Sequence, residues 1–119
     1  MRIKYTPQRS DVRYKIDGEV VYIKFGDKVT KVDFSNLKNG RLESAINHIS
    51  DAKKVDGELT ITLIQPLDKD GNKLPAVDDF DTSEAEEINY EWKSWEEIEK
   101  EENKPSESDI LTLAILELA

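Results

Sequence analysis

Apolar and polar residues alternate through much of the first sixty-six positions, as they do in strands with one buried face. The alternating segments are residues 2–6, 12–16, 20–25, 29–34 and 58–65. We expect Pro7 to end the first of these strands and Pro66 the last, because proline has no N–H to give to a sheet ladder. These segments predict a meander of short antiparallel strands.

Tight turns are predicted between the strands. Asp17-Gly18 and Asp56-Gly57 are pairs that suit the positive backbone angles of a hairpin turn, and Gly26-Asp27 turns the chain again. A short helix is predicted at residues 42–49, since Leu42, Ala45, Ile46 and Ile49 recur at helical spacing. We expect the sheet to stay open, with a helix covering one of its faces.

The second half of the chain has a different pattern. Residues 67–83 are polar and acidic, which is typical of a linker. A helix from about residue 84 to Glu102 is predicted by an apolar stripe at spacings of four, three and three, formed by Ile88, Trp92, Trp95 and Ile98. A capping box at Ser94–Glu97 would instead divide this helix into two pieces. Residues 110–119 are almost wholly apolar and predict a short terminal helix.

The sequence therefore predicts an α+β fold in three parts. A small antiparallel β-meander with a short helix occupies residues 1–66, and an acidic linker follows at residues 67–83. The third part, residues 84–119, is a helical arm that ends in the apolar terminal helix.

Charge divides the chain in the same place. The 119 residues carry a net charge of −9, made up of +3 in residues 1–66 and −12 in residues 67–119. Nucleic acid is disfavoured as a partner of the whole chain, because phosphate contacts need concentrated Lys and Arg. No apolar run is long enough for a transmembrane helix and no secretory signal opens the chain, so we expect no membrane partner.

One segment has the spacing of a calcium-binding loop. The oxygen-bearing side chains are Asp68, Asp70, Asn72 and, at the twelfth position, Asp79. Lys73, however, occupies the position where the sharp turn of such a loop requires glycine. A polar turn after a strand is the favoured interpretation, and we expect neither a metal nor another cofactor.

Catalytic chemistry has little support in the composition. The chain has no cysteine, and its one histidine, His48, lies near Ser50 and Asp51 in the sequence. Such proximity is not a catalytic triad, which needs geometry supplied by the fold. The carboxylates of residues 78–87 lie in the most polar stretch, whereas acid catalysis needs one carboxyl group removed from water. We expect that the protein is not an enzyme.

Apolar residues of the acidic half are the candidates for partner binding. Trp92 and Trp95 are the only tryptophans, and they either anchor an interface or complete the core of the small sheet. The apolar residues of the terminal helix cover nearly all of its faces, so self-association or a partner is expected to bury them. The candidate residues are Trp92, Trp95, Leu111, Ile115 and Leu118.

Several short segments, in this order along the chain, resemble one group of proteins. They are the opening Ile3–Asp11, the Phe34–Leu37 segment with Gly40 behind it, the hairpin Val55–Ile64, and Asn103–Glu107 before a short terminal helix. Together they resemble small proteins encoded in the tail gene clusters of bacteriophages and prophages, whose function is poorly characterised. Val32 takes a place where an aromatic residue is common in that group.

The resemblance implies a tail-associated accessory or structural protein that acts through protein–protein contacts and has no catalytic residues. Its partners would be phage tail or fibre proteins, or other copies of itself joined through the terminal helix. The alternative is an assembly chaperone that the finished particle does not retain. The expected location is the host bacterial cytoplasm during assembly, and the virion where the protein is retained.

Overall fold

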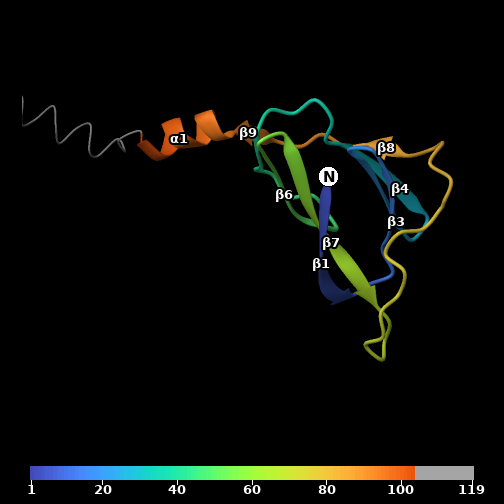
Figure 1. Cartoon of the computed structure of the whole chain (residues 1–119). Coiled ribbons are helices and arrows are strands. Elements are labelled where there is room, and N and C mark those ends of the chain that lie inside the picture. Colours follow the sequence, from blue (N-terminus) through green and yellow to red (C-terminus); the bar gives the residue numbers. More distant parts are fainter. Residues whose placement is uncertain (104–119) are drawn as a thin grey trace, which may run out of the picture.

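Residues 1–103 are described by the computed structural model, which consists mostly of strands in two sheets (Figure 1). The five-stranded sheet has the order β1-β7-β6-β5-β9, and the four-stranded sheet has the order β2-β3-β4-β8. One short helix, α1, follows the last strand. The elements are β1 Arg2–Arg9, β2 Arg13–Asp17, β3 Val20–Phe25, β4 Lys28–Asp33, β5 Gly40–Leu42, β6 Ile49–Val55, β7 Glu58–Leu67, β8 Glu86–Glu87, β9 Trp92–Ser94 and α1 Trp95–Asn103.

The predicted meander is confirmed for β2, β3 and β4, which pair as consecutive antiparallel neighbours. The hairpin between β6 and β7 is confirmed as well. Its turn residues Asp56 and Gly57 both have positive φ, 51° and 78°, as the tight hairpin turn predicted there requires.

The expectation that both prolines end their strands is wrong. The N–H of Ser10 donates to the carbonyl of Leu67 at 3.3 Å, which directs the even-numbered backbone groups of β1 towards its parallel neighbour β7. Pro7 therefore faces the open edge of the sheet, where no N–H is needed. Pro66 faces the side of β6, but β6 begins at Ile49 opposite Leu63 and does not reach Pro66. Leu74 lies there instead and donates its N–H to the Pro66 carbonyl at 2.9 Å, a bond that needs no N–H from proline.

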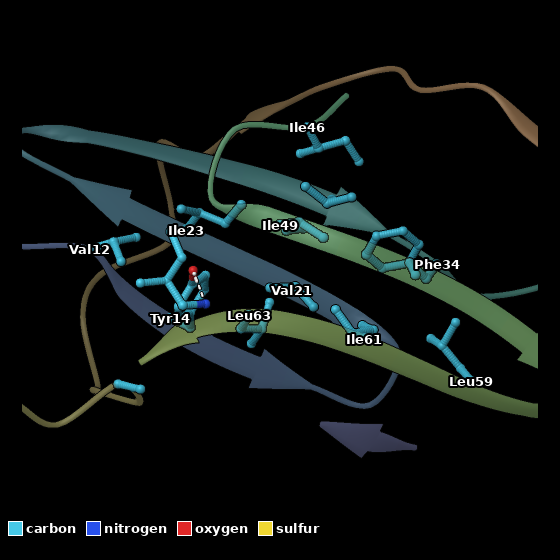
Figure 2. Close-up of a cluster of buried hydrophobic side chains, with 14 residues drawn as sticks. Val12, Tyr14, Val21, Ile23, Phe34, Ile46, Ile49, Leu59, Ile61 and Leu63 are labelled. Atoms are coloured by element: carbon cyan, nitrogen blue, oxygen red, sulfur yellow. Dashed lines mark hydrogen bonds between the residues drawn. The ribbon is translucent and has the colours of Figure 1, made fainter. Parts of the chain in front are cut away.

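One apolar core joins the two sheets. Tyr14, Val21 and Ile23 of the four-stranded sheet point towards Ile61 and Leu63 of the five-stranded sheet (Figure 2). All five side chains are buried, and no charged or polar residue is buried within the described part of the chain. The alternation in the sequence thus locates the buried faces. The expectation of one open sheet covered by a helix is wrong, because the buried face of each sheet packs against the other sheet.

The predicted helix at residues 42–49 is absent. Leu42 ends β5, and the segment after it bends and returns through a bridge between Ile46 and Ile49. His48 has a φ of 69°, a left-handed conformation that an α-helix does not accept.

The helix predicted from residue 84 begins only at Trp95. Residues 86–94 instead contain β8, which pairs in parallel with β4, and β9, which pairs with β5. Ile88, Tyr90 and Trp92 pack against the core at every second position, so this segment follows a strand period. Residues 84–94 therefore complete the β-module and do not belong to a helical arm.

The acidic segment predicted as a linker lies along the edge of β2. The N–H of Tyr14 donates to Ala76 and the N–H of Asp78 donates to the carbonyl of Tyr14, both at 2.8 Å. Phe80 is buried nearby, with Lys24 over its ring at 5.9 Å. This segment therefore pairs with the backbone edge of β2 at Tyr14.

Candidate functional site

Both tryptophans use their indole nitrogen within the chain. Trp92 donates to the carbonyl of Lys38 at 2.9 Å, and Trp95 donates to the carbonyl of Lys54 at 2.8 Å. Trp92 also packs near Phe34 and Tyr90, with ring centroids 6.3 Å and 6.5 Å away. The structure therefore places Trp92 at the margin of the core, while Trp95 lines a hollow of about 670 Å³ with Leu37, Lys38, Asn39, Lys54, Gly57, Ser94 and Glu96.

Helix α1 starts with the capping box that the sequence offers. The hydroxyl of Ser94 accepts the N–H of Glu97 at 3.2 Å, and the Glu97 carboxylate accepts the N–H of Ser94 at 3.3 Å. These two bonds fix the start of α1 directly after β9. Leu111, Ile115 and Leu118 of the predicted terminal helix lie outside the described residues.

The candidate calcium ligands do not gather at one point. The Asp68 carboxylate accepts the N–H groups of Asp70 and Asn72, both at 2.9 Å, which keeps its pKa below the ordinary value. Asp79 instead pairs with Lys15 of β2 at 2.9 Å, and this bond lowers the pKa of Asp79. Within residues 1–103 no three His, Cys, Asp or Glu side chains lie close enough to hold a metal ion.

Calcium is therefore expected to leave the protein unchanged. Tryptophan emission should stay constant as calcium is added to the millimolar range, because Asp68 is engaged in its turn and Asp79 lies with Lys15. Magnesium in the same titration controls for ionic strength. A saturable change with calcium alone would contradict the polar-turn interpretation.

His48 contacts an aromatic residue that the sequence analysis did not select. The rings of His48 and Phe25 are 4.6 Å apart, and burial lowers the pKa of the His48 imidazole. Both residues line a hollow of about 280 Å³, together with Ile23, Lys28, Thr30, Ala45, Ile46, Asn47 and Ile88. Phe25 stays 49% exposed and so leaves an aromatic surface at the end of β3.

The Tyr14 hydroxyl joins the two sheets. It donates to the carbonyl of His48 at 2.5 Å and accepts the N–H of Ile64 at 3.0 Å (the dashed line in Figure 2). The Ile64 N–H points towards β6 at the place where that strand is irregular, so the hydroxyl replaces a missing ladder partner. Burial raises the pKa of Tyr14 to about 12.

Alkaline pH is expected to destabilise the fold through two tyrosines. Burial raises the pKa values of Tyr14 and Tyr90 to about 12, from the ordinary value of 10.0. Above pH 10 the unfolded chain releases these protons while the folded chain retains them, so their stabilisation is complete below pH 10 and declines towards pH 12. Urea unfolding at pH 9, 10 and 11 should show this decline, and Tyr90→Phe should make it shallower. A variant with an unchanged slope would contradict the assignment.

The open edge of β1 is the longest uncovered backbone edge in the described part of the chain. Its eight residues are exposed apart from the half-buried Ile3, and Tyr5 is 42% exposed. The groups that face away from β7 belong to odd-numbered residues, so Ile3 and Tyr5 present N–H and C=O groups while Pro7 presents only C=O. The edge can therefore accept a short strand beside its first half.

No helix among the described residues is long and apolar enough to cross a membrane. Comparisons with protein-family models, with curated proteins and with solved structures found no match for the chain.

Proposed function

We propose that this chain is a phage or prophage tail-associated structural protein that acts through contacts with other proteins. The order of the segments that resemble tail-cluster proteins supports the phage or prophage tail as the setting. The observation that carries the contact role is the open edge of β1, a strand that is paired on one side only and whose eight residues are exposed apart from the half-buried Ile3.

Addition of a partner strand is the contact that this edge favours. Backbone groups of Ile3 and Tyr5 supply the hydrogen bonds, and the side chains around them supply the selectivity. Pro7 limits the added strand to the first half of β1, because its ring removes one donor. A short and defined contact of this kind suits a component that occupies one place in an assembly.

Mass spectrometry of purified particles tests the proposal. Particles from the strain that carries the gene should contain the chain at a fixed ratio to a tail protein. The assembly chaperone is the competing outcome, marked by abundance in the lysate and absence from the particles. Absence from both would contradict both roles.

Two substitutions at one position test the edge itself. Tyr5→Pro and Tyr5→Ala both remove the aromatic ring, but only Tyr5→Pro removes the outward N–H. We expect particles to retain the Tyr5→Ala chain and to lose the Tyr5→Pro chain, while circular dichroism shows that both variants fold. Equal retention of the two folded variants would contradict strand addition at β1.

A further inference from the structure

A row of basic side chains crosses the five-stranded sheet. The strand register aligns Arg2 of β1 with Thr60 of β7, then Lys53 of β6, Arg41 of β5 and Lys93 of β9. Residues directly opposite one another in neighbouring strands share a face of the sheet, so these five side chains lie on one face. The buried neighbours Ala52 and Ile61 lie on the other face, towards the core. We call Arg2, Lys53, Arg41 and Lys93 the basic row.

Two lysines without an ion pair lie at the β1 end of the basic row. Arg2 pairs with Glu58 at 2.8 Å, but the Arg2 side chain is 75% exposed, where an ion pair contributes little. Lys4 follows Arg2 on the same face, and Lys4 and Lys53 have no ion pair with the side chains described in residues 1–100. At the other end, Arg41 pairs with Glu43 at 2.8 Å and Lys93 has a contact within the chain.

A shallow hollow marks the same end. It measures about 350 Å³ and is lined by Arg2, Lys4, Lys53, Val55, Asp56, Glu58 and Thr60. Neighbouring strands are about 4.8 Å apart, so the distance from β1 to β6 across this hollow is about 10 Å. The carboxylates of Asp56 and Glu58 also line the hollow, and Glu58 is paired with Arg2, so Lys4 and Lys53 are the cations left for an acidic occupant.

The acidic counterpart is α1. Glu96 and Glu99 are exposed and, three positions apart, lie on one side of the helix. Nine residues give the helix a length of about 13 Å, which is enough to span the hollow. The start of α1 contacts β9 and β5, and Figure 1 shows the rest of the helix leading away from β9, on the opposite side of the five-stranded sheet from β1 in the strand order, so α1 does not reach the β1 end of the basic row of its own chain.

We propose that α1 of a second copy docks on the β1 end of the basic row, with Glu96 and Glu99 facing Arg2, Lys4 and Lys53. The acidic helix and the basic end of the sheet lie at separate places in the chain, so α1 of one copy can bind the sheet of another. This association does not depend on the tail role proposed above.

Sedimentation equilibrium of the full chain tests the association. Dimers or larger species should form at high micromolar concentration in 50 mM salt, and the dissociation constant should rise at least about tenfold in 500 mM salt, since exposed charges are screened. A protein that stays monomeric in 50 mM salt would overturn the proposal. Association that is indifferent to salt would overturn it too, and would point to an apolar contact.

Charge-reversal variants identify the two surfaces. Lys4→Glu with Lys53→Glu alters the sheet, and Glu96→Lys with Glu99→Lys alters the helix. Each double variant alone should associate at least about tenfold more weakly. An equimolar mixture should regain mixed dimers, because the unaltered helix of the first variant meets the unaltered sheet of the second. A mixture that stays monomeric would overturn the proposal.

Two further measurements exclude simpler explanations. Lys69→Glu with Lys73→Glu changes the net charge as much as the sheet variant does, but at an exposed turn beyond the other end of β7, and it should associate more strongly than the sheet variant. A poly-glutamate peptide serves as an acidic probe. A monomeric protein that binds this peptide through Lys4 and Lys53 would show that the occupant is an acidic segment of another protein and not a second copy.

Discussion

Gly40→Ala is expected to lower the free energy of unfolding by about 3 kcal/mol, the upper end of the usual cost of overpacking. A Cβ atom at residue 40 would lie 2.0 Å from the carbonyl oxygen of Lys93 and 2.8 Å from the Cα of Ser94. Both are backbone atoms of β9, so no side chain can turn aside and β9 must move from β5. Urea unfolding followed by circular dichroism measures the loss. The emission of Trp92 and Trp95 should also shift to the red, because β9 and its neighbours hold both indoles.

Gly26→Ala is the matched control. Gly26 has a φ of 62° but open space around the position of a Cβ atom. The variant should lose only about 1 kcal/mol, the cost of a left-handed alanine, and should keep the tryptophan emission of the wild type. If Gly40→Ala proved no more destabilising than Gly26→Ala, the close approach of β9 to β5 would not limit the residue at position 40.

Tyr14→Phe is expected to lower the free energy of unfolding by about 2 kcal/mol. The ring would still fill the core, but the Ile64 N–H would lose its acceptor in a buried place and the His48 carbonyl would lose its donor. Leaving a buried N–H unpaired lowers the free energy of unfolding by more than an average hydrogen bond contributes to it. We therefore expect a larger loss of stability than for removal of a surface hydroxyl. Urea unfolding at pH 7 measures the difference, with an unchanged slope against urea.

Tyr22→Phe is the control for the loss of a hydroxyl. Tyr22 is half-buried on the next strand, and its hydroxyl makes no hydrogen bond with the side chains or backbone described in residues 1–100. We expect a change within about 0.5 kcal/mol, as for ordinary surface substitutions. Equal losses in the two variants would mean that the Tyr14 hydroxyl does not replace a ladder partner of β7.

Local pattern was enough to predict the hairpins, since alternation and turn residues act between close neighbours in sequence. The prediction failed where the same residues fit both the helical period and the strand period. Ile88 and Trp92 fit a helical stripe with Trp95 and Ile98, but they fit a strand equally well with Tyr90, and pairing with β4 and β5 decides for the strand. Tertiary contacts of this kind override propensity in short segments.

The prolines show a second limit of sequence reasoning. Whether proline ends a strand depends on which side of the strand its missing N–H would face, and that side is set by the register with a distant neighbour. The basic row could not be predicted for the same reason. Arg2, Arg41 and Lys53 lie side by side only because four strands pair in this register. The surplus of +3 in residues 1–66 was the one signal in the sequence that pointed towards it.

The parallel pairing of β1 with β7 also sets an order of events during synthesis. Arg2 pairs with Thr60, so β1 must wait for 58 further residues before its partner exists. At the usual rates of translation this takes roughly 3 to 12 s, far longer than a hairpin needs to form. Because β1 is charged and mostly exposed, it can remain hydrated and unpaired until β7 has been made. A strand that is made well before its partner is thus placed late, and the closure of the five-stranded sheet is expected to be the slow step of folding.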